Sequence, residues 1–154
     1  MQQINEAKFI ERDVTLRDIM FSSEVSETRR AIVRWLALSL GIINPGESRQ
    51  SAIAVLDSLL YFHFSERSDP TLNDLQSYIS KNWEEINEKT LRYHLLQFRK
   101  KGLVENSKGK FYMAKPPIGD AYDEEEWARN YIDSLVKPIQ EKIIIALKEL
   151  KVRI

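Results

Sequence analysis

The chain has 154 residues, of which 23 are Lys or Arg and 23 are Asp or Glu, so its formal net charge is zero. Its 43% hydrophobic and 30% charged residues are typical of a globular protein and argue against a disordered one. No apolar run approaches the roughly 20 residues of a membrane helix, the first residues lack the pattern of a secretory signal, and the absence of cysteine excludes disulfides and thiolate metal sites. We therefore expect a cytoplasmic protein with no membrane partner.

Residues 1–46 are predicted to form a helical extension. A long helix is expected over 24–40, with Ser22 or Ser23 as its N-cap. Its apolar surface is broad enough to need cover from the rest of the chain or from a second copy, and it contains Ile32, Val33, Trp35, Leu36, Leu38 and Leu40. Its basic face is expected to be solvated or salt-bridged, with DNA backbone contact as the alternative, and consists of Arg29, Arg30 and Arg34.

Asn44-Pro-Gly46 is a strong turn pattern and marks the boundary of a second segment, residues 47–115. The helix expected over 47–65 is apolar nearly all round, which predicts a central core helix, and His63 within it is expected to be a buried structural histidine. Thr71 is expected to cap a short helix that ends near Ile79. A turn containing Trp83 then leads to the next helix.

The helix predicted over 87–101 has an apolar face at Leu91, Leu95 and Phe98, with Asn87 as N-cap and Gly102 as the glycine that ends it. Two short strands within 103–114 follow. Turn residues 106–109 separate them, so they predict a hairpin with Lys108 and Lys110 at or beside its tip.

The positive charge of the chain is concentrated in this helix and hairpin. Residues 87–115 contain 8 basic and 2 acidic residues, a local charge of +6, whereas residues 1–86 sum to −4 and residues 116–154 to −2. A local basic patch is what contact with phosphate requires, although exposed helices are often rich in Lys and Arg for solubility alone.

The stretch Thr90–Val104 opens on Thr, has Leu at the inward steps and ends in Gly-Leu-Val before the hairpin. This pattern resembles the recognition helix and wing of a winged helix-turn-helix domain, over roughly residues 50 to 115. Lys101 departs from it, because many members have a small apolar residue there. The fold class expected is therefore mainly α with a small β-hairpin wing, flanked by N-terminal and C-terminal helices.

The resemblance implies sequence-specific binding of double-stranded DNA by a transcriptional regulator, with helix 87–101 in the major groove. Arg92 is expected to contact a guanine through its planar fork, Thr90 a phosphate, and the two hairpin lysines the backbone or minor groove. The DNA-binding residues expected are Lys89, Thr90, Arg92, Tyr93, Gln97, Lys100, Lys108 and Lys110.

Residues 116–154 are predicted to form a C-terminal helix that starts at the acidic run 123–126 and carries a heptad seam, which Pro138 is expected to kink or interrupt. The seam contains Ile132, Val136, Ile139, Ile143, Ala146 and Leu150. The helix either packs back on 24–40 or pairs with its twin. We favour a homodimer through 24–40 and 123–150, which would set two recognition helices about 34 Å apart.

The sequence contains no pattern of catalytic residues, phosphate-binding loop or metal-ligand spacing, so no enzyme activity, cofactor or metal is expected. The alternative function is a winged-helix protein–protein interaction module in a larger assembly. The zero net charge and the outward position expected for Leu96 favour that alternative.

Overall fold

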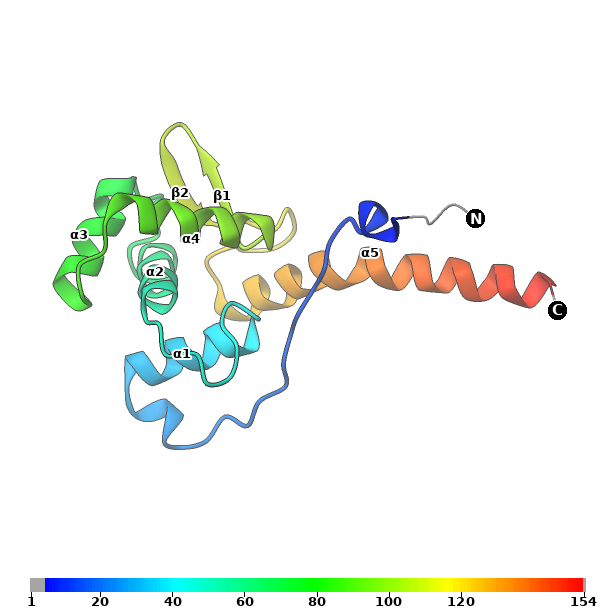
Figure 1. Cartoon of the computed structure of the whole chain (residues 1–154), viewed down its shortest axis with the longest axis horizontal. Coiled ribbons are helices and arrows are strands. Elements are labelled where there is room, and N and C mark those ends of the chain that lie inside the picture. Colours follow the sequence, from blue (N-terminus) through cyan, green and yellow to red (C-terminus); the bar gives the residue numbers. More distant parts are fainter. Residues whose placement is uncertain (1–4, 154) are drawn as a thin grey trace.

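The computed structural model describes residues 5–153, and within them the chain is mainly helical with one small antiparallel hairpin, so that part of the predicted fold class is confirmed (Figure 1). The regular elements are α1 (Arg29–Ser39), α2 (Ser51–Leu60), α3 (Leu72–Asn82), α4 (Glu88–Lys100), β1 (Val104–Ser107), β2 (Lys110–Met113) and α5 (Glu124–Arg153). Short 3-10 turns cover Glu6–Phe9 and Val25–Glu27, and α2 continues as a π-helical stretch over Tyr61–Glu66.

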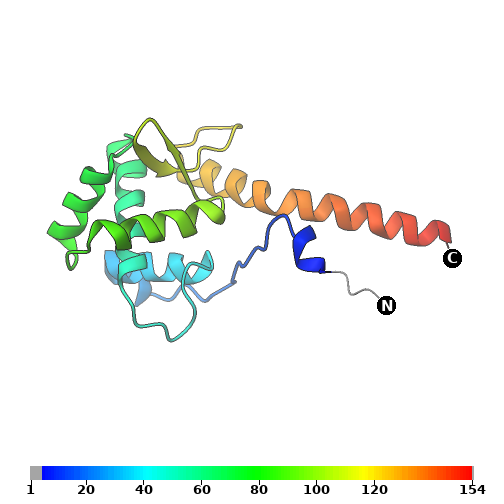
Figure 2. The same ribbon diagram turned by 45° about the horizontal axis from the view of Figure 1, so that its top comes forward.

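Helix α2 is the centre of the fold. Eight of its ten residues are buried, because its sequence is apolar nearly all round, as predicted. α1 lies on one side of α2, while α3, α4 and the hairpin lie on the other (Figures 1 and 2). The arrangement leaves the outer faces of α4 and the hairpin in solvent, away from α1.

The first predicted helix was placed too early in the chain. α1 begins at Arg29, and Thr28 is extended, with its hydroxyl accepting a hydrogen bond from the Ala31 N–H at 3.1 Å. The Ser22 hydroxyl caps only the short turn, through the Val25 N–H at 3.3 Å. Several hydroxyl residues in a row offer competing caps, and the last one is the cap of α1. α2 likewise begins at Ser51 rather than at residue 47.

The caps around the next two helices agree with the predictions. Thr71 and Asp74 form a reciprocal capping box at the start of α3, with distances of 3.2 and 2.9 Å. The Asn87 side chain accepts from the Thr90 N–H at 2.7 Å and starts α4. Gly102 has a φ of +75° just after α4, in the left-handed conformation that glycine adopts without strain.

The hairpin pairs Val104 with Met113 and closes through Ser107 and Lys110. Its turn residues Lys108 and Gly109 both have positive φ, 53° and 77°, as in a type I′ turn. The free edge of β2 is held at the start of α3, because the Phe111 N–H donates to the Pro70 carbonyl at 2.9 Å and Lys110 forms a bridge with Thr71. The hairpin is therefore fixed to the helical core at its base.

Helix α5 has a buried first part and an exposed second part. Trp127, Tyr131 and Leu135 are buried, and the Trp127 Nε1–H donates to the Ala114 carbonyl at 2.7 Å. Every residue from 136 to 153 is exposed, and the helix runs through Pro138 as one element instead of restarting there. Figures 1 and 2 show this second part projecting from the body of the molecule.

The N-terminal segment runs along the outside of these helices. Arg17 donates to the carbonyls of Leu38 and Ile43, both at 2.8 Å, and Glu11 pairs with Lys142 at 2.6 Å. One hydrophobic cluster includes residues from α1, α2 and α5. The division into 1–46, 47–115 and 116–154 remains a prediction about organisation, and its three segments share this core.

Candidate nucleic-acid interface

One face of α4 is exposed, and it carries basic and aromatic side chains. Leu91, Leu95 and Phe98 are buried against the core, so helical periodicity turns the opposite residues outward. The exposed residues of that outer face are Lys89, Arg92, Tyr93, Leu96 and Lys100. Together with the hairpin turn they form the surface that we call the α4–hairpin face.

Of the eight DNA-binding residues predicted from the sequence, six have exposed side chains. These are Lys89, Arg92, Tyr93, Lys100, Lys108 and Lys110. Thr90 and Gln97 are half-buried along one edge of α4. The fold thus brings the eight residues to one helix and the hairpin beside it, and the five charged ones are all exposed.

Arg92 is not a free cation, because its guanidinium pairs with Glu88 one turn earlier at 3.2 Å. Both side chains are 59% exposed. A solvent-exposed i,i+4 pair of this kind is worth about 0.3–0.5 kcal/mol. Arg92 can therefore exchange Glu88 for a phosphate or a base at little cost.

Thr90 offers less to an anion than its position at the helix start suggests. Its N–H is already bonded to the Asn87 side chain, so it is not available to a phosphate. The half-buried hydroxyl is the remaining group through which Thr90 could contact DNA.

Lys108 occupies a backbone conformation that suits few residues. Its φ of 53° is in the left-handed region, where a lysine is uncommon and where Asn or Gly is preferred in this type of turn. Gly109 follows, and no heavy atom lies within 4 Å of the position that a Cβ would take there. The turn therefore presents a lysine at its tip at some conformational cost.

Lys115 belongs to the basic stretch 87–115, but its side chain makes structural contacts within the protein. Its ammonium group bonds both carboxylate oxygens of Asp69, at 2.8 and 3.1 Å, and lies 4.6 Å from the centre of the Tyr112 ring. Partial burial opposes its charge, but the Asp69 carboxylate outweighs that effect and raises the Lys115 pKa. This lysine ties the chain just after β2 to the segment before α3.

Two arginines near this face were missed by the sequence analysis. Arg99 is exposed and lines a groove between the end of α4 and the hairpin. It lies seven residues after Arg92, and that spacing could have placed it on the same stripe of the helix. Arg12 reaches the same groove from the N-terminal segment, beside Gly102, and nothing in the local sequence indicates that position.

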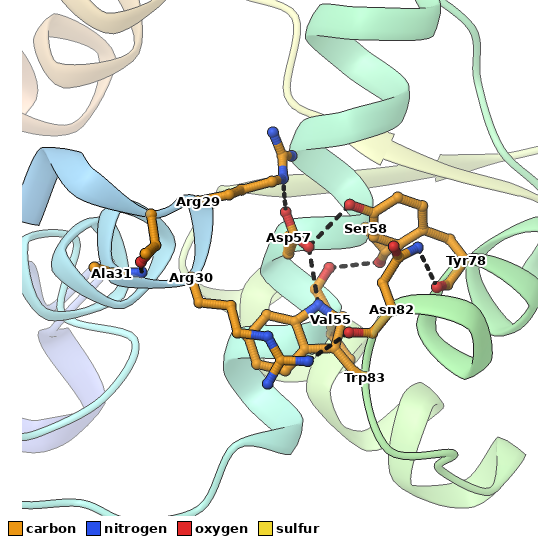
Figure 3. A network of polar contacts seen from close by, with 10 residues as sticks. Arg29, Arg30, Ala31, Val55, Asp57, Ser58, Tyr78, Asn82 and Trp83 are labelled. Carbon is orange, nitrogen blue, oxygen red and sulfur yellow. Dashed lines mark hydrogen bonds and ion pairs between the residues drawn. The ribbon is translucent and has the colours of Figure 1, made fainter.

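A polar network around Asp57 in α2 lies beside the turn that precedes α4 (Figure 3). The buried Asp57 carboxylate accepts from Arg29 of α1 at 2.6 Å and from Tyr78 of α3 and Trp83 at 2.9 Å each. The Arg30 guanidinium lies 4.0 Å above the Trp83 ring and donates to the Asn82 carbonyl. The network joins α1, α2 and α3 to the turn that leads into α4.

Both histidines are structural, as expected for His63. The His63 Nε2–H donates to the Ala121 carbonyl at 2.5 Å, and the His94 ring bonds the Ser51 hydroxyl at 2.8 Å. Burial lowers the pKa of each imidazole, and nearby Lys115 and Arg49 add to the lowering at His63 and His94 respectively. Neither histidine lies on the α4–hairpin face.

Within residues 5–153, no three His, Cys, Asp or Glu side chains gather in a way that could hold a metal ion. No helix in that part of the chain is both long enough and apolar enough to cross a membrane.

Comparison of the chain with protein-family models, with curated proteins and with solved structures found no match.

Proposed function

We propose that the protein is a winged helix-turn-helix protein that binds double-stranded DNA through the α4–hairpin face and regulates transcription as a dimer. The observation that supports the proposal most directly is the concentration of exposed basic side chains on α4 and at the hairpin turn. The order of elements α2, α3, α4 and hairpin, with Thr71 bridging to β2, also agrees with the resemblance in the sequence.

In this proposal, α4 lies in the major groove. Arg92 leaves Glu88 and reads a guanine through its two parallel N–H donors, while Lys89 and Tyr93 contact neighbouring edges or phosphates. The hairpin contacts the backbone beside the groove through Lys108 and Lys110, and Lys100 and Arg99 add charge at the far end of α4. Each cation placed near a phosphate releases a counterion, which makes the binding salt-dependent.

The first test is the binding of random-sequence duplex DNA, measured by fluorescence anisotropy at several salt concentrations. We expect a dissociation constant of about 1–100 µM at physiological salt, with a steep loss of affinity as salt rises. Absence of binding at low salt would contradict the proposal.

A paired charge-removal experiment locates the binding face. Replacing both hairpin lysines, Lys108→Gln with Lys110→Gln, is expected to reduce the logarithmic salt slope by about two, because two phosphate contacts are lost. The matched control is Lys8→Gln with Lys137→Gln, which removes the same charge from exposed positions away from the face. Equal effects of the two double variants would show that only the overall charge of the protein matters.

Sequence recognition is tested at Arg92, after selection of a preferred site from a random DNA library. Arg92→Ala is expected to cost about 1–3 kcal/mol on that site and to relax the preference at one base pair. Unchanged affinity and preference would show that α4 does not lie in the groove as proposed.

A protein–protein interaction module is the second candidate, and one observation favours it. Tyr93 and Leu96 are adjacent on the outer face of α4 and are 58% and 48% exposed, so the basic face contains an apolar patch. In this alternative, Leu96→Lys abolishes capture of a protein partner. In the DNA proposal, the same substitution adds a cation beside the groove and leaves non-specific DNA binding equal or stronger.

A further inference from the structure

Within residues 5–153, the second part of α5 has an apolar face that the rest of the chain leaves largely exposed. The large exposed side chains of the predicted seam that it carries are Val136, Ile139, Ile143 and Leu150, and they are 38% to 59% exposed. Phe9 and Ile10 of the N-terminal segment line a groove together with Ile139 and Ile143, yet these two seam side chains remain 39% and 54% exposed. An exposed apolar stripe of this length on a soluble helix is expected to be covered by another surface.

An apolar groove lies at the opposite end of the same helix. Its floor consists of side chains from α1, the end of α2 and the start of α5, namely Ile32, Val33, Leu36, Leu60, Phe64 and Trp127. Ala128 lines the groove, and Ile132 and Val136 follow it at steps of four residues. The groove is therefore continuous with the seam, and one straight helix lying along α5 would cover both.

The charges along α5 indicate which helix fits there. Residues 123–135 contain five acidic residues and one basic residue, whereas residues 136–153 contain five basic residues and two acidic ones. The groove is lined by Glu27 and Glu124, and also by Arg29, whose charge is paired with the Asp57 carboxylate. The basic end of α5 therefore complements the acidic start of a second α5 when the two helices run in opposite directions. In that arrangement the two helix macrodipoles are also antiparallel, which is favourable.

We infer that two copies of this chain pair through antiparallel α5 helices, so that the basic end of each helix fills the apolar groove between α1 and α5 of the other. The two-fold axis passes near Pro138, midway along the helix, and the same surface of both copies is used. This interface is separate from the α4–hairpin face. The pairing is tested without DNA, so its failure is distinguishable from failure of the proposed DNA binding.

The first measurement is the mass of the protein in solution, by light scattering across a range of concentrations. We expect a dimer for the wild type and a monomer for Ile143→Lys, because that substitution places a charge in the seam. The matched control is Ile145→Lys, which changes an isoleucine that is 61% exposed on the opposite side of the helix and should leave the dimer intact. A monomeric wild type, or equal effects of the two variants, would overturn the inference.

Helix direction is tested by spin-label distances, which the absence of native cysteine makes simple. A single label at Leu150→Cys lies about twelve residues from the proposed axis, so two labels in an antiparallel pair are separated by roughly 36 Å along the helices. A parallel pair would bring them within about 15 Å. The short distance would contradict the antiparallel arrangement.

Charge reversal gives a second test of direction, with opposite signs for the two arrangements. Lys148→Glu with Lys151→Glu changes the charge of residues 136–153 from +3 to −1. In the antiparallel pair this change sets like charges against each other and weakens the dimer, and Glu124→Lys with Glu126→Lys should restore it. In a parallel pair it removes repulsion between two basic ends, and a strengthened dimer would overturn the inference.

Discussion

Asp57 is the residue at which α1, α2, α3 and the turn before α4 are joined. It is 2% exposed and accepts hydrogen bonds from three side chains, whereas its ionic partner Arg29 is 53% exposed on its side chain. Much of the stabilisation therefore comes from the neutral donors Tyr78 and Trp83, because the arginine can be solvated without Asp57.

Replacing this carboxylate should destabilise the whole domain. Asp57→Ala leaves the Tyr78 hydroxyl and the Trp83 indole N–H without their acceptor, and we expect a loss of about 2–4 kcal/mol in urea unfolding. Asp57→Asn retains an acceptor oxygen and should lose less. Equal losses for the two variants would mean that charge, and not hydrogen bonding, is what Asp57 contributes.

The two histidines predict how stability depends on pH. The pKa values of His63 and His94 are lowered in the folded state, mainly by burial. Below the ordinary histidine pKa of about 6.5, the unfolded chain therefore binds more protons than the folded protein does. The contribution of the two histidines to the free energy of unfolding is therefore fully present above about pH 6.5. It is lost as the pH falls through their folded-state pKa values. In the double variant His63→Gln with His94→Gln, the free energy of unfolding should change less between pH 7 and pH 5.5 than in the wild type. An unchanged slope would assign the pH dependence to carboxylates.

At the scale of single elements, the hairpin turn places Lys108 where stability alone favours another residue. Because Asn is preferred at this position of a type I′ turn, Lys108→Asn is expected to stabilise the protein by up to about 1 kcal/mol while weakening DNA binding. Thermal unfolding and anisotropy on the same variant check both parts. Loss of stability would show that the lysine has a structural contact that outweighs the backbone strain.

The elements also show what the sequence could and could not predict. The caps at Thr71, Asn87 and Gly102 were predictable, because each depends on residues within one helical turn. The start of α1 was not, since Ser22, Ser23 and Thr28 are all suitable caps and no local pattern distinguishes them. The outward face of α4 followed from periodicity, which also predicts Arg99.

The missed contacts are those between residues that are distant in the sequence. The Asp57 network joins Arg29, Tyr78 and Trp83, and Arg12 lies beside Gly102. No local pattern links these positions, because the tertiary packing of α1 and the N-terminal segment creates the contacts.

At the scale of the whole molecule, the hydrophobic core ends before the chain does. The last buried residue of α5 is Leu135, and the ion pair between Glu11 and Lys142 is exposed. Removing residues 143–154 should therefore change the free energy of unfolding of the monomer by no more than about 0.5 kcal/mol. It should also remove any dependence of the melting temperature on protein concentration, which the full chain is expected to show if it pairs through α5. A large loss of stability in dilute solution would mean that residues 143–154 stabilise the folded monomer to which they belong.

The position of Trp83 makes it suitable as a fluorescent reporter of the turn before α4. Its indole lies under the Arg30 guanidinium and donates a hydrogen bond to Asp57, and the residue stands in the turn before α4. The other two tryptophans, Trp35 and Trp127, lie in α1 and α5. With the other two replaced by Phe, the emission of Trp83 becomes an intrinsic optical reporter of the α3–α4 turn. Its wavelength and quenching would follow, without an added dye, any movement of α4 when a ligand arrives.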